Sequence, residues 1–161
     1  KTFLEGHAEI NGGLPQPGRK VYFPRATDNE SQSIKINGIE TLTVSKNWIF
    51  DCAVEQTGKY SYVKSDSITE LIFEEGCINV CSWDSPKLAK VTLAKSIKKI
   101  VADAFSGNPN LSEVVIPEGA KYSYPDNYRR AIFSTSKAFS GCAFSIKTKT
   151  AIKATGYTGE F

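Results

Sequence analysis

The stretch "VADAFSGNPNLSEVVIPEG", residues 101–119, decides the fold class of this chain. It places an Ala-Phe pair before a short polar turn, and after the turn Leu111, Val114 and Ile116 form a brief apolar run that ends at a proline. The run fits the pattern Φ-x-x-Φ-x-Φ, in which Φ is aliphatic or aromatic. Because side chains alternate along a strand, Val114 and Ile116 share one face, which predicts a short strand with one buried side.

The same pattern occurs three times at a regular distance. The segments "ITELIF" (68–73), "LAKVTL" (88–93) and "LSEVVI" (111–116) start at residues 68, 88 and 111, and so lie 20 and 23 residues apart. These distances fall within the period of about 20–29 residues that is typical of leucine-rich repeats. The pattern therefore predicts a repeat architecture in the second part of the chain.

An alanine-phenylalanine pair followed by Ser-Gly also recurs, and its copies end at Phe105 and Phe139. Together these elements resemble the BspA-like subclass of leucine-rich repeat proteins, whose repeat runs roughly L-x-x-I-x-I-P, then I-x-x-I, then A-F-x-x-C. Pro117 and Cys142 match the proline and the cysteine, whereas Asn108 takes the place of the cysteine in the preceding repeat. The resemblance covers residues 67–161 and implies stacked coils that bury together what no single coil could bury.

The last part of the chain departs from the regular repeat. The segment "YPDNYRRAIFSTS" (124–136) is an insertion of about ten residues, and insertions in repeat proteins lie in surface loops. A helix at about 147–155, with Ile146, Ala151, Ile152 and Ala154 facing inward and Gly156 as its stop, is expected to cap the open end of the stack. This ending resembles the close of other BspA-like chains and predicts a genuine C-terminus.

The N-terminal part of the chain, residues 1–65, carries strand signals without helical periodicity, among them "KVYFPR", "QSIKI" and "IETLTV". Asn37-Gly38 lies between the last two and favours a tight hairpin, and "TGKYSY" has a weak likeness to immunoglobulin-like domains. The predicted fold is therefore mainly β. A small antiparallel β-sandwich-like domain over 1–66 is followed by a short BspA-like leucine-rich repeat solenoid over 67–161 with a C-terminal capping helix.

Composition narrows the class of protein further. The formal net charge of +3 is too small to indicate a nucleic-acid partner, and no apolar run reaches the about 18 residues of a membrane span. Cys77 and Cys81 are four residues apart, a spacing unlike that of structural zinc sites, so we expect no metal. Buried free thiols are the default expectation, although the oxidation state of this pair stays open.

The residue types and their spacing argue against an enzyme. His7 is the only histidine, so no Ser-His-Asp or Cys-His arrangement is evident. Glu74 and Glu75 are adjacent and would face opposite sides of a strand, and no Gly-rich phosphate loop occurs. We therefore expect a protein that is not an enzyme, with no catalytic residue and no cofactor.

Candidate interaction residues follow from the repeat and from the insertion. Aligned strands would expose two columns, an alternating-charge ladder Glu70–Lys90–Glu113 and a narrow apolar strip Ile72–Thr92–Val115, which a partner or the N-terminal domain could cover. The insertion contributes tyrosine and arginine, the residue types enriched at interface hot spots, unless it folds back over the core. The candidate interaction residues are Ile72, Thr92, Val115, Tyr124, Tyr128, Arg129 and Arg130.

The resemblance implies a secreted or cell-surface protein, mostly of bacteria, associated with adhesion and protein binding. We expect a non-enzymatic, adhesin-like recognition protein that binds a host or matrix protein. Two alternatives stay open. One is a carbohydrate-binding module in which Trp48, Tyr60 or Tyr62 forms a stacking platform on the N-terminal domain, and the other is a structural spacer without a ligand. The chain starts at Lys1 and lacks methionine, which predicts a fragment or a mature chain without its signal peptide.

Overall fold

The computed structural model describes residues 2–16, 18–51, 58–125 and 136–161. Within these ranges the chain is mainly β, with thirteen short strands and one helix. Its elements are β1 (Thr2–Phe3), β2 (Glu9–Asn11), β3 (Val21–Tyr22), β4 (Gln32–Asn37), β5 (Thr41–Val44), β6 (Trp48–Ile49), β7 (Ser61–Lys64), β8 (Glu70–Phe73), β9 (Asn79–Val80), β10 (Ser82–Asp84), β11 (Lys90–Thr92), β12 (Lys99–Ile100), β13 (Glu113–Val115) and α1 (Ile146–Ala154).

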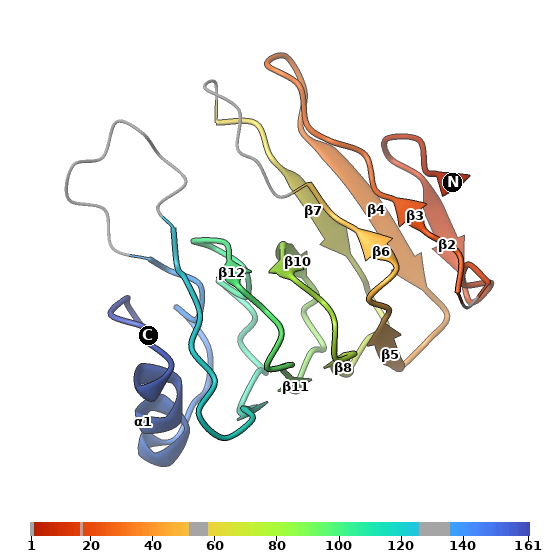
Figure 1. The fold of residues 1–161 in the computed structure, drawn as a ribbon. Coiled ribbons are helices and arrows are strands. Elements are labelled where there is room, and N and C mark those ends of the chain that lie inside the picture. Colours follow the sequence, from red (N-terminus) through yellow and green to blue (C-terminus); the bar gives the residue numbers. More distant parts are fainter. Residues whose placement is uncertain (1, 17, 52–57, 126–135) are drawn as a thin grey trace.

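The strands form four sheets, and every strand pair of the described residues is parallel. The sheets have the orders β1-β3-β6, β10-β7-β4-β2, β13-β11-β8-β5 and β12-β9, and we call the second the β7 sheet and the third the β5 sheet. The chain passes through three of them in the same order twice, as β3, β4, β5 and again as β6, β7, β8. Figure 1 shows these turns of chain following one another from the N-terminal strands to α1.

The antiparallel sandwich expected over 1–66 is wrong, because its strands pair in parallel. The strands on either side of Asn37-Gly38 do not form a hairpin, since β4 belongs to the β7 sheet and β5 to the β5 sheet. Gly38, with a φ of 75°, turns a corner between two sheets and stacks on Gly12, whose N–H donates to the Asn37 carbonyl at 2.9 Å. Asn-Gly permits positive φ in either setting, so the dipeptide alone does not distinguish a corner from a hairpin.

The expected boundary at residue 66 does not coincide with a break in the sheets. In the β7 sheet, β7 pairs with β10, and in the β5 sheet, β5 pairs with β8. Both pairs join a strand that precedes the boundary to a strand that follows it. The backbone hydrogen bonds of these sheets therefore continue across the position at which the sequence pattern suggested two modules.

The register of the β5 sheet confirms the two outward columns. Lys90 is the partner of Glu70 and of Glu113 in the neighbouring strands. Thr92 aligns in the same way with Ile72 and Val115, and β5 extends the second column by Thr43. The residues between the columns are Leu42, Leu71, Val91 and Val114, all buried. Alternation along short strands thus places one apolar row inside and two rows outside.

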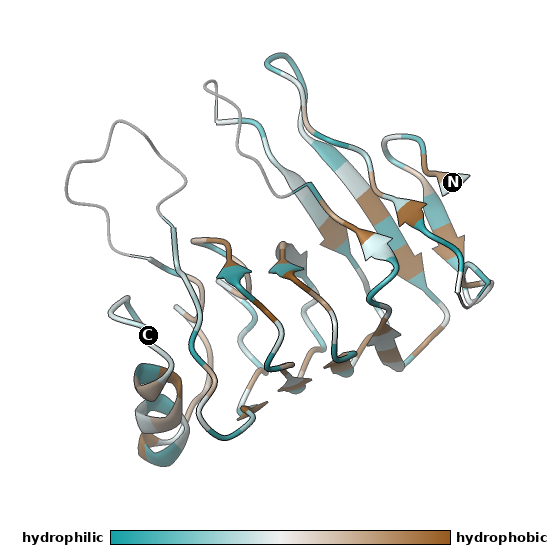
Figure 2. Cartoon of the chain, viewed as in Figure 1, coloured by the Kyte–Doolittle hydropathy of each residue, from teal (hydrophilic) through white to brown (hydrophobic). Residues whose placement is uncertain are grey.

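The interior is a continuous apolar core that follows the stack, and Figure 2 shows hydrophobic positions recurring along its strands. Phe105 and Phe139 are fully buried, as the Ala-Phe motif predicted. Because each turn of the chain places its apolar side chains above those of the turn before it, the core grows with every turn.

The C-terminal helix is present, although its predicted packing is only partly correct. Ser145 caps it by accepting a hydrogen bond from the Thr148 N–H, and Gly156 follows it with a φ of 105°. Ile152 is fully buried, but Ile146 is 85% exposed. Ala151 and Ala154 are exposed as well, so the prediction that these three face inward is wrong. Ile152 is the one side chain of the helix that is buried, and Ile146 in its first turn extends into solvent.

The cysteines differ in their chemistry. Cys77 and Cys142 are free, whereas Cys81 is disulfide-bonded, so the expectation of a free thiol is wrong for Cys81. Cys52 lies outside the described residues. Burial, together with the charge of Glu74, raises the pKa of Cys77 to about 11, and burial raises that of Cys142 to about 11 as well. The two free thiols are therefore protonated at neutral pH and poor nucleophiles.

Candidate functional site

The outward face of the β5 sheet carries the apolar strip. Val115 is 39% exposed, whereas Ile72 and Thr92 are half-buried. In the adjacent column the Lys90 ammonium lies 3.9 Å from the Glu113 carboxylate. The described part of the N-terminal half does not lie over this face, because β5 joins the edge of the same sheet beside β8. Coverage by an N-terminal domain, one of the two expected alternatives, is therefore wrong for the residues described.

The insertion is described only at its two ends, residues 124–125 and Ser136. Tyr124 is half-buried, its hydroxyl lies 2.6 Å from the Thr155 hydroxyl, and its ring packs edge-on at 5.0 Å from that of Tyr157. Burial raises the pKa of Tyr124 well above its usual range. These contacts place Tyr124 in the packing of the C-terminal end and favour the folded-back interpretation for it. Tyr128, Arg129 and Arg130 lie outside the described residues.

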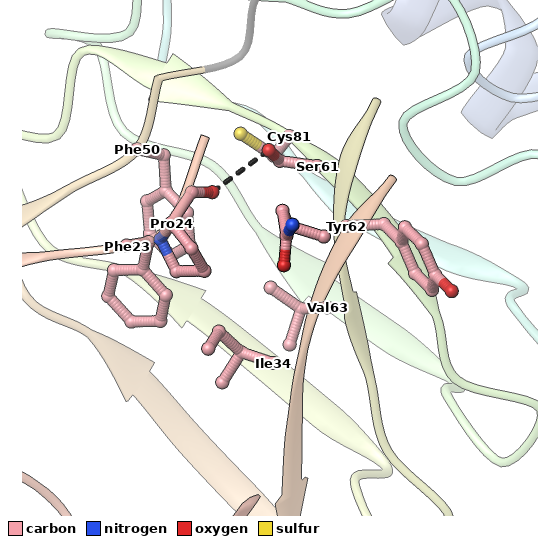
Figure 3. A pocket seen from close by; sticks show the side chains of 9 residues that line it. Phe23, Pro24, Ile34, Phe50, Ser61, Tyr62, Val63 and Cys81 are labelled. Carbon is pink, nitrogen blue, oxygen red and sulfur yellow. Dashed lines mark hydrogen bonds between the residues drawn. The ribbon is translucent and has the colours of Figure 1, made fainter. Parts of the chain in front are cut away.

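A polar groove of about 340 Å³ crosses the outward face of the β7 sheet. Figure 3 draws a separate, interior pocket next to β7 and shows that Tyr62 points away from it, on the opposite side of its strand from Val63, which agrees with alternation along β7. We call this feature the tyrosine groove. Its lining residues are Tyr60, Tyr62, Lys64, Ser82, Trp83, Asp84, Asp103 and Ser106.

The register of β7 and β10 determines the geometry of the tyrosine groove. Ser82 is the partner of Tyr62, and Asp84 is the partner of Lys64. The Ser82 hydroxyl donates to the Asp103 carboxylate at 3.0 Å, which carries the line of residues into the next turn of the chain.

The two tyrosine rings lie side by side at this groove. Their centroids, those of Tyr60 and Tyr62, are 5.2 Å apart, and the Lys64 ammonium lies 5.6 Å from the centroid of the Tyr62 ring. The groove thus combines aromatic surface with one cationic donor and the carboxylates of Asp84 and Asp103. Both side chains of the pair are half-buried, so each keeps part of its surface open.

The sequence alone indicated only part of this groove. Trp48, proposed as a member of an aromatic platform, is 8% exposed and belongs to the core, so that assignment is wrong. Tyr60 and Tyr62 are at the groove, as the platform hypothesis required. Asp84 and Asp103 were missed, because they belong to later turns of the chain and only parallel stacking brings them beside the tyrosines.

The structure also contains a Ser-His-Glu arrangement that the sequence did not indicate. His7 Nδ1 lies 3.1 Å from the Ser33 hydroxyl, and His7 Nε2 lies 2.7 Å from the Glu30 carboxylate. The side chains of His7 and Glu30 are 53% and 60% exposed. In Ser-His-acid enzymes a buried acid orients the imidazole. An exposed ion pair, in contrast, contributes little to stability, because water screens it. The geometry therefore corrects the expectation that no such arrangement is evident, and its acid is exposed to solvent, unlike the buried acid of those enzymes.

Metal-binding clusters and membrane spans are both absent from the described residues. These residues contain no group of three or more His, Cys, Asp or Glu side chains placed to hold a metal ion. Among the same residues, no helix is both long enough and apolar enough to cross a membrane.

No protein-family model, no curated protein and no solved structure matches this chain. The geometry of the two outward faces is therefore the basis on which a function can be argued.

Proposed function

We propose that this chain is a non-enzymatic recognition protein of the BspA-like leucine-rich repeat type, secreted by or displayed on bacteria. It binds a protein partner through the outward face of the β5 sheet. The observation that carries the proposal is the alignment of Ile72, Thr92 and Val115 in one row beside a row of alternating charges.

Three features support a leucine-rich repeat scaffold. The three Φ-x-x-Φ-x-Φ segments contribute adjacent parallel strands of one sheet, in chain order. The two Ala-Phe motifs lie on successive turns, where the Phe105 N–H donates to the Ala138 carbonyl at 2.7 Å. The helix after the last turn provides a cap, which a stack of repeats needs for solubility.

The disulfide at Cys81 supports a secreted or cell-surface location. Disulfides persist in oxidising compartments and are rare in the cytosol. The net charge of +3 favours a protein partner over nucleic acid, which would require a denser basic patch.

The β5 sheet suits recognition of a folded protein surface. The sheet has four strands, and its inner strands are hydrogen-bonded on both sides. The backbone that carries the outward side chains is therefore rigid before binding. A rigid face loses little conformational entropy on association. The apolar row supplies contact area, and Lys90 with its acidic neighbours supplies orientation through charge complementarity.

The test is binding to immobilised fibronectin, laminin, collagen and fibrinogen by surface plasmon resonance, with Val115→Asp as the test variant. We expect at least one of these proteins to bind, and the charge introduced into the apolar row to weaken that binding about tenfold or more. Ile49→Asp is the matched control, because Ile49 is 38% exposed on a different sheet and Val115 is 39% exposed. Equal losses in both variants, or binding to none of the four proteins, would contradict the proposal.

A further inference from the structure

The tyrosine groove lies on a different sheet from the proposed protein-binding face and crosses three successive turns of the chain. Tyr62 lies on β7, Ser82 on β10 and Asp103 in the turn after β12. Because neighbouring parallel strands are about 4.8 Å apart, this line of residues spans about 10 Å. The small Ser82 side chain lies between two larger ones, which explains why the surface is hollowed here.

The volume of the groove fits a small organic ligand better than a single ion. Its about 340 Å³ falls at the lower end of the about 300–1,000 Å³ of small-molecule sites. Lys64, the register partner of Asp84, brings a positive charge into the lining of the groove, which disfavours a bare cation. The ligand therefore needs to be polar without carrying a strong net charge.

The chemistry of the lining groups narrows the ligand further. The Tyr62 ring is half-buried and carries the Lys64 ammonium over it, and its remaining surface is apolar and can be covered by a ring with axial C–H groups. The carboxylates of Asp84 and Asp103 accept hydrogen bonds, whereas the Lys64 ammonium donates and the Ser106 hydroxyl does both. A pyranose matches this set, because its hydroxyls donate and accept while one face of the ring is apolar.

From this combination we propose that the tyrosine groove is a binding site for a neutral oligosaccharide, in which one sugar ring stacks on Tyr62 and its hydroxyls bond to Asp84 and Asp103. The site extends the protein's function to glycan recognition and is separate from the β5 sheet. If no sugar binds at the groove, the protein-binding proposal for the β5 sheet is unaffected. If no protein binds the β5 sheet, the glycan proposal is unaffected in the same way.

The experiment is isothermal titration calorimetry of the full chain with cellohexaose, xylohexaose, chitohexaose and mannohexaose. We expect at least one of these sugars to bind, and Tyr62→Ala to weaken that binding about tenfold, since the stacking surface is lost. Tyr62→Phe keeps the ring and is expected to bind within about twofold of the natural protein. Val115→Asp, on the β5 sheet, is expected to leave sugar binding unchanged.

A second measurement locates the site without a substitution. Amide chemical shifts of ¹⁵N-labelled protein are followed during titration with the sugar that binds, and the shifts are expected to gather at Tyr62, Ser82 and Asp103. Shifts centred on another face would overturn the proposal. The proposal would also be overturned if none of the four sugars bound at concentrations up to about 10 mM, because specific binding has a dissociation constant below this value. Binding of hexalysine in place of the sugars would overturn it in favour of a basic peptide.

Discussion

The rings of Phe105 and Phe139 stack with their centroids 5.8 Å apart and their planes inclined by 26°, and both side chains are fully buried. The two residues end the two Ala-Phe motifs, so the contact joins successive turns of the chain. Their motifs are also tied by the hydrogen bond from the Phe105 N–H to the Ala138 carbonyl. Removal of either ring should therefore uncouple the last turns from the rest of the stack.

Phe105→Ala is expected to lower the free energy of unfolding by about 3–5 kcal/mol, because it leaves a cavity in a packed core. Urea denaturation followed by circular dichroism measures the change. Phe3→Ala is the control, since the Phe3 side chain is 71% exposed and its loss should cost less than about 1 kcal/mol. Similar losses in the two variants would show that Phe105 is not part of a packed interior.

Asn108 provides a second test, because its buried side chain joins two turns of backbone. Its Oδ1 accepts from the Ser85 N–H at 3.1 Å, and its Nδ2 donates to the Trp83 carbonyl at 3.0 Å. Asn108→Ala would leave these backbone groups without partners, at a cost of about 2–4 kcal/mol in unfolding free energy. Asn110→Ala removes one exposed bond, to the Pro86 carbonyl, and should cost less than about 1 kcal/mol. Thermal and urea denaturation measure the unfolding free energy of both variants. An equal loss of unfolding free energy in the two would refute the bridging role of Asn108.

The buried thiol of Cys77 predicts a loss of stability in alkali. Its pKa is raised from 9.0 to about 11, so the unfolded chain gives up the thiol proton first as the pH rises. The free energy of unfolding is therefore unaffected by this group below about pH 9, and falls by about 2 kcal/mol as the pH approaches 11. Denaturation at a series of pH values measures this slope.

Cys77→Ala is the control for the alkaline effect. Burial also raises the pKa of Tyr122 to about 12, so part of the slope should remain in the variant. The difference between the two slopes isolates the Cys77 thiol. Identical slopes would mean that the thiol is as accessible in the folded protein as in the unfolded chain.

Lys90 tests the register of the charge ladder. Lys90→Glu would place three carboxylates in one row, and like charges on adjacent strands repel. Because the Lys90 and Glu113 side chains are 38% and 59% exposed, the expected loss is below about 1 kcal/mol. It should disappear at about 1 M NaCl, where the screening length is about 3 Å. Lys95→Glu, on an exposed turn, serves as the control for overall charge, and a loss unaffected by salt would contradict an electrostatic origin.

Much of the structure of the second half of the chain could be predicted, because the regular spacing of its apolar residues indicates a repeat. The alignment of Glu70 with Lys90 and Glu113 follows directly from the three Φ-x-x-Φ-x-Φ segments, and the burial of Phe105 follows from the Ala-Phe motif. A further copy was missed. "IETLTV" (39–44) fits the same pattern and becomes β5, but its distance from the copy that starts at Ile68 is longer than the distances between the later copies. It therefore appeared to belong to another module.

The sequence by itself determined the alternation of buried and exposed side chains, the rows that neighbouring strands form and the helix at the end. Only the tertiary structure decided that the first strands pair in parallel. A short strand shows the same alternation of apolar and polar residues whether its neighbour runs parallel or antiparallel. It also decided the tyrosine groove. Tyr62 and Asp103 are far apart in the chain, and they meet because each turn returns to the same face about 4.8 Å from the turn before it.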